Sequence, residues 1–174
     1  MCIRDSCRVF SGEGLTIYVD INVNGDMSRA AILPFDTTHR VRDSCLCLHV
    51  QRAARTLARR FDDAFRPVKL NNGQFSLLVS LNRPDPPGMA SVADLLGMDR
   101  TTLTAALKPL ERRGLLKITP DPSDRRSRLL HLTLQGKTLL ARAVPIWERT
   151  SQHLETLLGD VNPNSLRRNL RSLS

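Results

Sequence analysis

Aromatic side chains are scarce in this chain: it has one tryptophan, one tyrosine and five phenylalanines among 174 residues. Proteins that hold single-stranded nucleic acid usually stack its bases on aromatic rings. Two of these seven residues, Phe10 and Tyr18, lie in the N-terminal stretch, so few rings remain for such a platform. If the partner is a nucleic acid, duplex DNA is therefore a better candidate than a single strand.

The sequence also lacks long apolar runs and a secretory type of start. No run approaches the roughly 20 apolar residues that are needed to span a bilayer. The first residues do not combine a cationic region with a following apolar stretch. We therefore expect a cytoplasmic protein with no membrane partner.

Cysteines are few and clustered. All four of them, Cys2, Cys7, Cys45 and Cys47, lie near the N-terminus. They lack the spacing of a zinc ribbon and are poorly placed to staple a fold. We expect a reduced setting, no metal site and no cofactor.

Catalytic motifs are missing as well. The four histidines are scattered, at positions 39, 49, 131 and 153. No nucleophile–base spacing, phosphate-binding loop or pair of acids accompanies them. The sequence therefore predicts that the protein is not an enzyme.

What the chain has in excess is positive charge. Its formal net charge is +9 at pH 7, and its isoelectric point is near 10.4. Residues 1–26 hold two arginines and four acids, so residues 27–174 carry +11. Such an excess favours a polyanionic partner, either nucleic acid or an anionic membrane surface. The alternative is a basic protein without a partner of this kind.

The N-terminal stretch differs from the rest of the chain. Residues 1–36 have mixed polarity and no sustained period, which predicts a disordered tail. The opening Met-Cys-Ile-Arg-Asp-Ser resembles translated sequencing-adapter sequence, and Met27 could be a second start. We interpret residues 1–26 as not native to the protein. The alternative is a genuine short strand at about Leu15–Val23.

Residues 37–174 have the pattern of one helical domain. Four helices are predicted in its first part, over about residues 40–65, 73–83, 89–96 and 100–113. Asn71 or Asn72 can cap the second of them, and Asp99 can cap the fourth. Gly97 can supply the left-handed conformation that ends the third. Pro109 should kink the fourth helix near its C-terminal end.

A hairpin and two more helices complete the predicted domain. Leu115–Thr119 and Arg128–Leu132 are expected to be strands, joined by a turn with two prolines. Thr133 or a neighbour can cap a long helix, and Asn162 with Pro163 can start a last one. The fold class is thus mainly α with a small β-hairpin wing. We expect a winged helix-turn-helix with about six helices.

The helix at about 100–113 carries the pattern of a DNA-reading helix. Its leucines form a stripe that should be buried, which turns small, polar and basic residues outward: Arg100, Thr101, Thr102, Thr104, Ala105 and Lys108. Small side chains allow close approach to a major groove, threonine can contact base edges or a thymine methyl, and cations suit phosphates or guanine. The alternative is an ordinary solvated helix face.

The turn of the hairpin adds a second basic element. Asp124, Arg125, Arg126 and Arg128 place four charges within five residues, which no hydrophobic core requires. An arginine-bearing tip can enter a narrow minor groove, where the negative potential is enhanced. The helix and the hairpin together predict that the chain binds double-stranded DNA.

These residues resemble the MarR family of bacterial winged-helix regulators. The family's hairpin signature is matched by Asp124, Arg126, Leu132, Thr133 and Gly136. The family's leucine-rich helix, which ends just before the hairpin, is matched by Leu110, Glu111, Gly114 and Leu115. The resemblance implies a DNA-binding winged helix at about 72–133 and a homodimer formed through helices at about 40–66 and 134–174. It implies that Asp124 holds an arginine by a salt bridge. It also implies repression of nearby genes and release from DNA by a small-molecule effector or an oxidant.

One cysteine bears on that release. In the hydroperoxide-sensing branch of the family a reactive cysteine lies early in the first helix, where this chain has Cys47. The tyrosines that tune it are replaced here by Gln51 and Phe61, so the resemblance to this branch is partial. The alternative is a buried cysteine in a helix. Cys45 and His49 could also share a metal with a partner chain, although two ligands alone make no site.

The function that we predict is a sequence-specific transcriptional regulator that binds a pseudo-palindromic duplex operator as a homodimer. An alternative is a winged-helix module that binds protein or RNA, because a fold alone does not define a function. The arginines of the turn favour DNA, since a protein-binding module does not need them.

Overall fold

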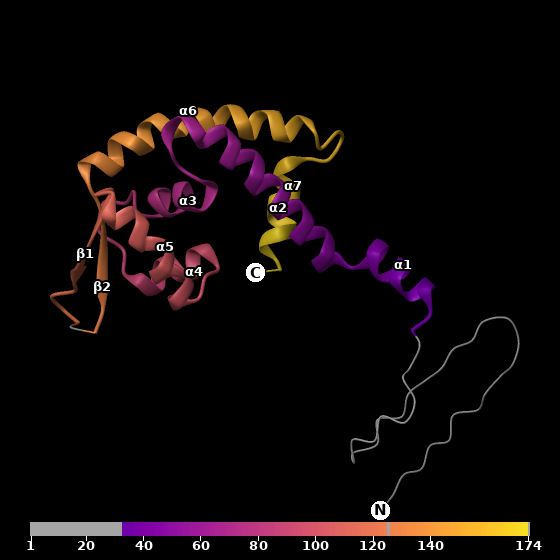
Figure 1. Cartoon of the computed structure of the whole chain (residues 1–174), viewed down its shortest axis with the longest axis horizontal. Helices are drawn as coiled ribbons and strands as arrows, with labels where there is room; N and C mark the ends of the chain where they lie inside the picture. The colour runs from indigo at the N-terminus through magenta and orange to yellow at the C-terminus, as the bar shows by residue number, and fades with distance from the viewer. Residues whose placement is uncertain (1–32, 125, 174) are drawn as a thin grey trace, which may run out of the picture. The chain divides into compact units, whose positions relative to one another are not determined.

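The computed structural model describes residues 33–124 and 126–173. They form seven α-helices, one 3₁₀ segment and one two-stranded sheet, shown in Figure 1. The chain divides into two units, residues 1–53 and 54–174. No helix in the described ranges is long and apolar enough to cross a membrane. The expected tail and the alternative strand at Leu15–Val23 lie almost wholly outside these ranges.

The first unit contains α1 (Phe35–Ser44) and the beginning of α2 (Leu46–Phe65). One helix from about residue 40 was predicted here, preceded by a tail to residue 36. Instead the chain is helical from Phe35 and breaks at Cys45, whose backbone is extended (φ −74°, ψ 102°). The apolar stripe of α2 begins at Leu46 and does not continue into Arg-Asp-Ser, so no periodic pattern favours one continuous helix through the break. This extra helix explains why seven are found and not six.

The second unit holds the remaining elements. After the 3₁₀ segment (Arg66–Val68) come α3 (Asn72–Ser80), α4 (Met89–Leu96), α5 (Arg100–Arg112), β1 (Leu116–Pro120), β2 (Arg128–Leu132), α6 (Leu134–Thr156) and α7 (Pro163–Arg171). The hairpin extends away from the cluster of α3, α4 and α5 (Figure 1). This order confirms the predicted winged helix-turn-helix.

The core of this unit lies among α3, α4, α5 and the base of the hairpin. The predicted stripe of α5 is fully buried: Leu103, Leu107 and Leu110 have no exposed surface. Leu78 of α3 and Val92 of α4 are equally buried and belong to the same cluster. At about 25 cal/mol per Å² of apolar surface, burial of each leucine contributes roughly 2 kcal/mol. This stripe fixes which face of α5 turns outward.

The sheet is antiparallel and pairs Leu116 with Leu132 at its base and Pro120 with Arg128 near its tip. The first strand was predicted one residue too early. Leu115 donates its N–H to the Leu110 carbonyl at 3.0 Å, and Gly114 has a φ of 68°, so both residues close α5 before the strand begins. Glycine accepts this left-handed conformation without strain.

A close joint connects the hairpin to α6. The Thr133 hydroxyl lies 2.7 Å from the Gly114 carbonyl oxygen and 3.0 Å from that of Leu115. It also accepts the Gly136 N–H at 3.0 Å, which makes Thr133 the cap of α6 as predicted. Gly136 is buried against the Leu115 carbonyl, so a side chain has no room there. Two residues of the hairpin signature therefore build the fold and do not face a ligand.

The other predicted caps are also present. Asn71 accepts the Gln74 N–H, and the Gln74 side chain accepts the Asn71 N–H in return, which forms a capping box at α3. Asp99 caps α5, and Asn162 caps α7 with Pro163 at its first position. Pro109 lies in the last turn of α5, and the helix continues past it to Arg112. The ion pair of Arg167 with Glu155 joins α7 to α6.

Candidate nucleic-acid interface

The start of α5 is held by one carboxylate. Asp99 accepts the Thr102 N–H at 2.8 Å and the Thr102 hydroxyl at 2.6 Å. The hydroxyl bond, followed by the backbone bond, lowers the pKa of Asp99 below its ordinary value. The carboxylate is therefore ionised at neutral pH. Because its pKa is lowered, its stabilisation of the helix start is present above the unfolded pKa and is lost as the pH falls through the folded one.

The outer face of α5 is open to solvent. All six residues predicted to read DNA from this helix are exposed: Arg100, Thr101, Thr102, Thr104, Ala105 and Lys108. They occupy the side opposite the buried leucines. The face is small and polar at its N-terminal end and carries one cation at each end. A helix with these properties can enter a major groove along its first turns.

The three threonines are not equivalent, which the sequence did not reveal. The Thr104 hydroxyl donates to the Arg100 carbonyl at 2.7 Å, and the Thr102 hydroxyl donates to Asp99. Both protons are therefore used within the helix. Within the described part of the chain, the Thr101 side chain makes no hydrogen bond. Thr101 is thus the threonine whose hydroxyl is free to donate to a base edge.

The turn of the hairpin is built by two aspartates. Asp121 accepts the N–H and the hydroxyl of Ser123, at 2.8 and 2.6 Å. These bonds, the hydroxyl bond first, lower the pKa of Asp121. Asp124 accepts the Arg126 N–H at 2.9 Å, and its carbonyl accepts the Ser127 N–H at 2.9 Å. The turn is therefore ordered by its own polar residues.

The wing arginines differ in how far the structure describes them. Arg126 and Arg128 are exposed, as is Asp124, while Arg125 lies outside the described residues. The Asp124 carboxylate accepts the backbone N–H of Arg126 and so helps to order the turn. Its ion pair with an arginine side chain stays a prediction.

A hollow lies between the wing and the helices α4 and α5. It has a volume of about 280 Å³ and is lined by Met89, Ala90, Ala93, Asp94, Met98, Arg100, Arg126, Ser127 and Arg128. Three of these residues are cations and one is an acid. The first turn of α5 and the second strand of the wing thus present arginines to the same space. Their positive charge can hold the sugar–phosphate backbone while α5 and the wing approach adjacent grooves.

The predicted redox residue is accessible. Cys47 is exposed on α2, and the Gln51 amide donates to its sulfur at 3.2 Å. Cys45 is half-buried at the break between α1 and α2. No group of three or more His, Cys, Asp or Glu side chains in residues 33–124 and 126–173 is placed to hold a metal ion. Redox sensing by Cys47 stays a prediction.

Comparisons with known proteins give a consistent result. The MarR family model matches residues 70–127. The regulator PecS of Dickeya dadantii (strain 3937) is 32% identical over 127 residues, which cover 64% of this chain and 76% of PecS. PecS is an HTH-type transcriptional regulator.

Solved structures match over a larger part of the chain. The regulator MosR of M. tuberculosis in complex with DNA has a TM-score of 0.68 and 34% identity, and the match covers 75% of this chain and 93% of MosR. The transcriptional repressor CouR bound to a 23-mer DNA duplex has a TM-score of 0.68 and 33% identity, with 82% and 99% covered. CouR bound to p-coumaroyl-CoA matches with a TM-score of 0.65 and 32% identity, with 74% and 90% covered.

Proposed function

Because the chain belongs to the MarR family of DNA-binding transcriptional regulators, we propose that it is a repressor which binds a pseudo-palindromic duplex operator as a homodimer. A small ligand or an oxidant releases it. The observation that carries this proposal is the hollow shared by Arg100, Arg126 and Arg128. It aligns the cations of the helix and the wing over one surface, which a DNA backbone can occupy.

The homodimer is supported by apolar surface that the single chain leaves uncovered. On α2, the apolar stripe that begins at Leu46 is largely exposed: Leu46 is 59% exposed, Val50 36% and Leu57 44%. Leu157 and Val161, near the start of α7, are more than half exposed, and α7 has no buried residue. Exposed apolar residues that recur along helices are typical of protein interfaces. A second copy of the chain is the partner that the family resemblance implies for these helices.

Release by a ligand is supported by a relative. CouR has been solved both with DNA and with p-coumaroyl-CoA. We propose that this chain likewise responds to a small molecule. Release by an oxidant would act through Cys47, which is an exposed residue.

Replacing Thr101 with valine should weaken operator binding more than the same change at Thr104. Valine has the shape of threonine without its hydroxyl, and only the Thr101 hydroxyl is free to donate to a base. We expect Thr101→Val to reduce affinity at least fivefold, since a base contact contributes about 1–3 kcal/mol. Thr104→Val should stay within about twofold. Fluorescence anisotropy with a labelled operator measures both, and a larger loss at Thr104 would contradict this assignment.

The proposal as a whole is tested by selecting bound sites from a random duplex library with the full chain. We expect enriched sequences with two inverted half-sites, their centres about one helical turn apart. Binding should fall steeply with salt, because phosphate contacts release counterions. Enrichment of single, asymmetric sites would contradict the dimer.

A competition experiment tests the second candidate function, a winged helix that binds protein or RNA. If an RNA hairpin displaces duplex DNA from the protein at physiological salt, that alternative replaces the operator model. The exposed arginines of the hollow favour duplex DNA, since their placement beside an open helix face suits two adjacent grooves.

A further inference from the structure

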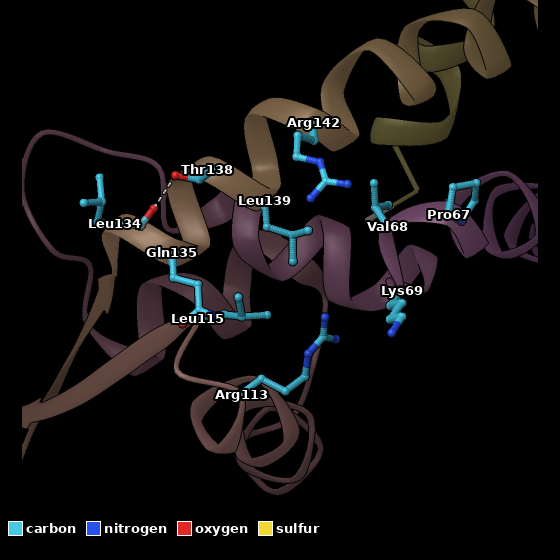
Figure 2. Close-up of a pocket in the computed structure, with 10 residues that line it drawn as sticks. All are labelled: Pro67, Val68, Lys69, Arg113, Leu115, Leu134, Gln135, Thr138, Leu139 and Arg142. Atoms are coloured by element: carbon cyan, nitrogen blue, oxygen red, sulfur yellow. Dashed lines mark hydrogen bonds between the residues drawn. The ribbon is translucent and has the colours of Figure 1, made fainter.

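A second and larger cavity lies at the C-terminal end of α5, whereas the hollow beside the wing lies at its N-terminal end. Its volume is about 830 Å³, within the range of ligand pockets in proteins. It lies among the 3₁₀ segment, the end of α5 and the first turns of α6, all within the second unit (Figure 2). The cavity is lined by Pro67, Val68, Lys69, Arg113, Leu115, Leu134, Gln135, Thr138, Leu139 and Arg142.

The polar lining is cationic and carries no acid. Lys69, Arg113 and Arg142 each come from a different element, and no aspartate or glutamate lines the cavity. In Figure 2 the side chains of Arg142 and Arg113 extend toward each other from α6 above and from the end of α5 below. None of the three side chains forms an ion pair or hydrogen bond with another described residue. All three residues are exposed, and three cations around one open cavity attract a ligand with more than one negative charge more strongly than one with a single charge.

The rest of the lining is apolar. Leu115 and Val68 are almost fully buried, Leu139 is half-buried, and Leu134 is 81% exposed. In Figure 2 the Leu134 side chain points away from the arginines, whereas Val68 and Leu139 lie beside Arg142 and can cover the apolar part of a ligand. A guanidinium group can donate two parallel hydrogen bonds to phosphate oxygens. Two arginines can therefore share one phosphate monoester, which carries more negative charge than a single carboxylate. We propose that this cavity binds an organic phosphate, with its phosphate at Arg113 and Arg142 and its apolar body against Val68 and Leu139.

The position of the cavity connects it to DNA binding. Arg113 is the C-cap of α5, so it lies at the other end of the helix from Arg100, about 20 Å away at 1.5 Å per residue. A phosphate held by both Arg113 and Arg142 ties the end of α5 to α6 and restrains how α5 can tilt. The binding site stands on the cavity alone, whereas its role as the effector site rests on the proposed function.

Isothermal titration of the full chain without DNA tests the site. The probes are phenyl phosphate, benzoate and inorganic phosphate, at equal ionic strength and pH 7.5, where phosphate monoesters are mainly dianions. We expect phenyl phosphate to bind at least tenfold more tightly than either of the others. Benzoate keeps the ring with one charge, and inorganic phosphate keeps the charge without a ring. Equal affinity for benzoate or for inorganic phosphate would overturn the assigned ligand class.

Three variants locate the binding. Arg113→Gln, Arg142→Gln and Lys69→Asn each remove one lining charge, and asparagine tolerates the left-handed backbone of Lys69 (φ 52°). Each should weaken phenyl phosphate binding at least fivefold. Arg112→Gln and Arg149→Gln remove the same charge from exposed positions of α5 and α6 outside the lining, and should stay within twofold. Equal losses in the variants and the controls would overturn the site.

The effector role is tested separately with the selected operator. Phenyl phosphate should change operator affinity of the natural chain at least threefold, benzoate at equal ionic strength should not, and Arg142→Gln should abolish the response. An unchanged operator affinity would overturn the effector role while the titration still decides the site. If no operator is bound at all, the proposed function fails, and the titration without DNA remains valid.

Discussion

Replacing Gly136 with alanine is expected to destabilise the protein by more than about 3 kcal/mol, because the added carbon has no space. A Cβ at this position would lie much closer than 3.0 Å to the Leu115 carbonyl oxygen, and 2.8 Å from Leu132 Cδ1. The oxygen belongs to backbone that Leu110 and Thr133 already hold by hydrogen bonds, so it cannot retreat cheaply. The joint between the hairpin and α6 should therefore open. Thermal unfolding at a fixed protein concentration measures the loss.

Gly73→Ala is the matched control. Gly73 lies in the first turn of α3, and its added carbon would meet nothing closer than 3.6 Å. Alanine favours a helix over glycine by up to about 1 kcal/mol, so this variant should be unchanged or slightly more stable. If both variants unfold at the same temperature as the natural chain, the close approach at Gly136 does not constrain the fold.

The contrast between these glycines shows what sequence can predict. Caps depend on a residue and the three that follow it, so Asn71, Asp99, Thr133 and Asn162 could be identified by type and spacing. The buried stripe of α5 follows equally from the helical period. Because that stripe defines the outer face, the amino-acid sequence alone is enough to name the residues of α5 that are predicted to read DNA.

Other features depend on contacts that no local pattern records. The start of β1 is delayed because Leu115 bonds back to Leu110. Which threonine keeps a free hydroxyl depends on the carbonyl and carboxylate acceptors within reach. The cationic cavity joins residues that are up to 75 positions apart, from Pro67 to Arg142.

The arginine of the wing offers the most direct test of DNA binding. Arg126→Ala should weaken operator binding at least tenfold, because its side chain is exposed beside Arg100 and Arg128 in the hollow. A guanidinium that contacts DNA adds electrostatic attraction which alanine cannot replace. The Arg126 N–H still reaches Asp124 in the variant, so the turn keeps its backbone bond and the melting temperature should not change. Gel-shift titration against the selected operator gives the affinity.

Arg149→Ala controls for the loss of one positive charge. Arg149 is exposed on α6, away from the lining of the hollow, so this variant should bind within about twofold of the natural chain. The dependence of affinity on salt separates two roles for Arg126. If it contacts a phosphate, the slope of log affinity against log salt should fall by about one for each arginine removed. If it enters the minor groove, the loss should be larger for operators whose groove is narrow, as in A-tracts. Unchanged affinity with an intact fold would exclude both roles for Arg126.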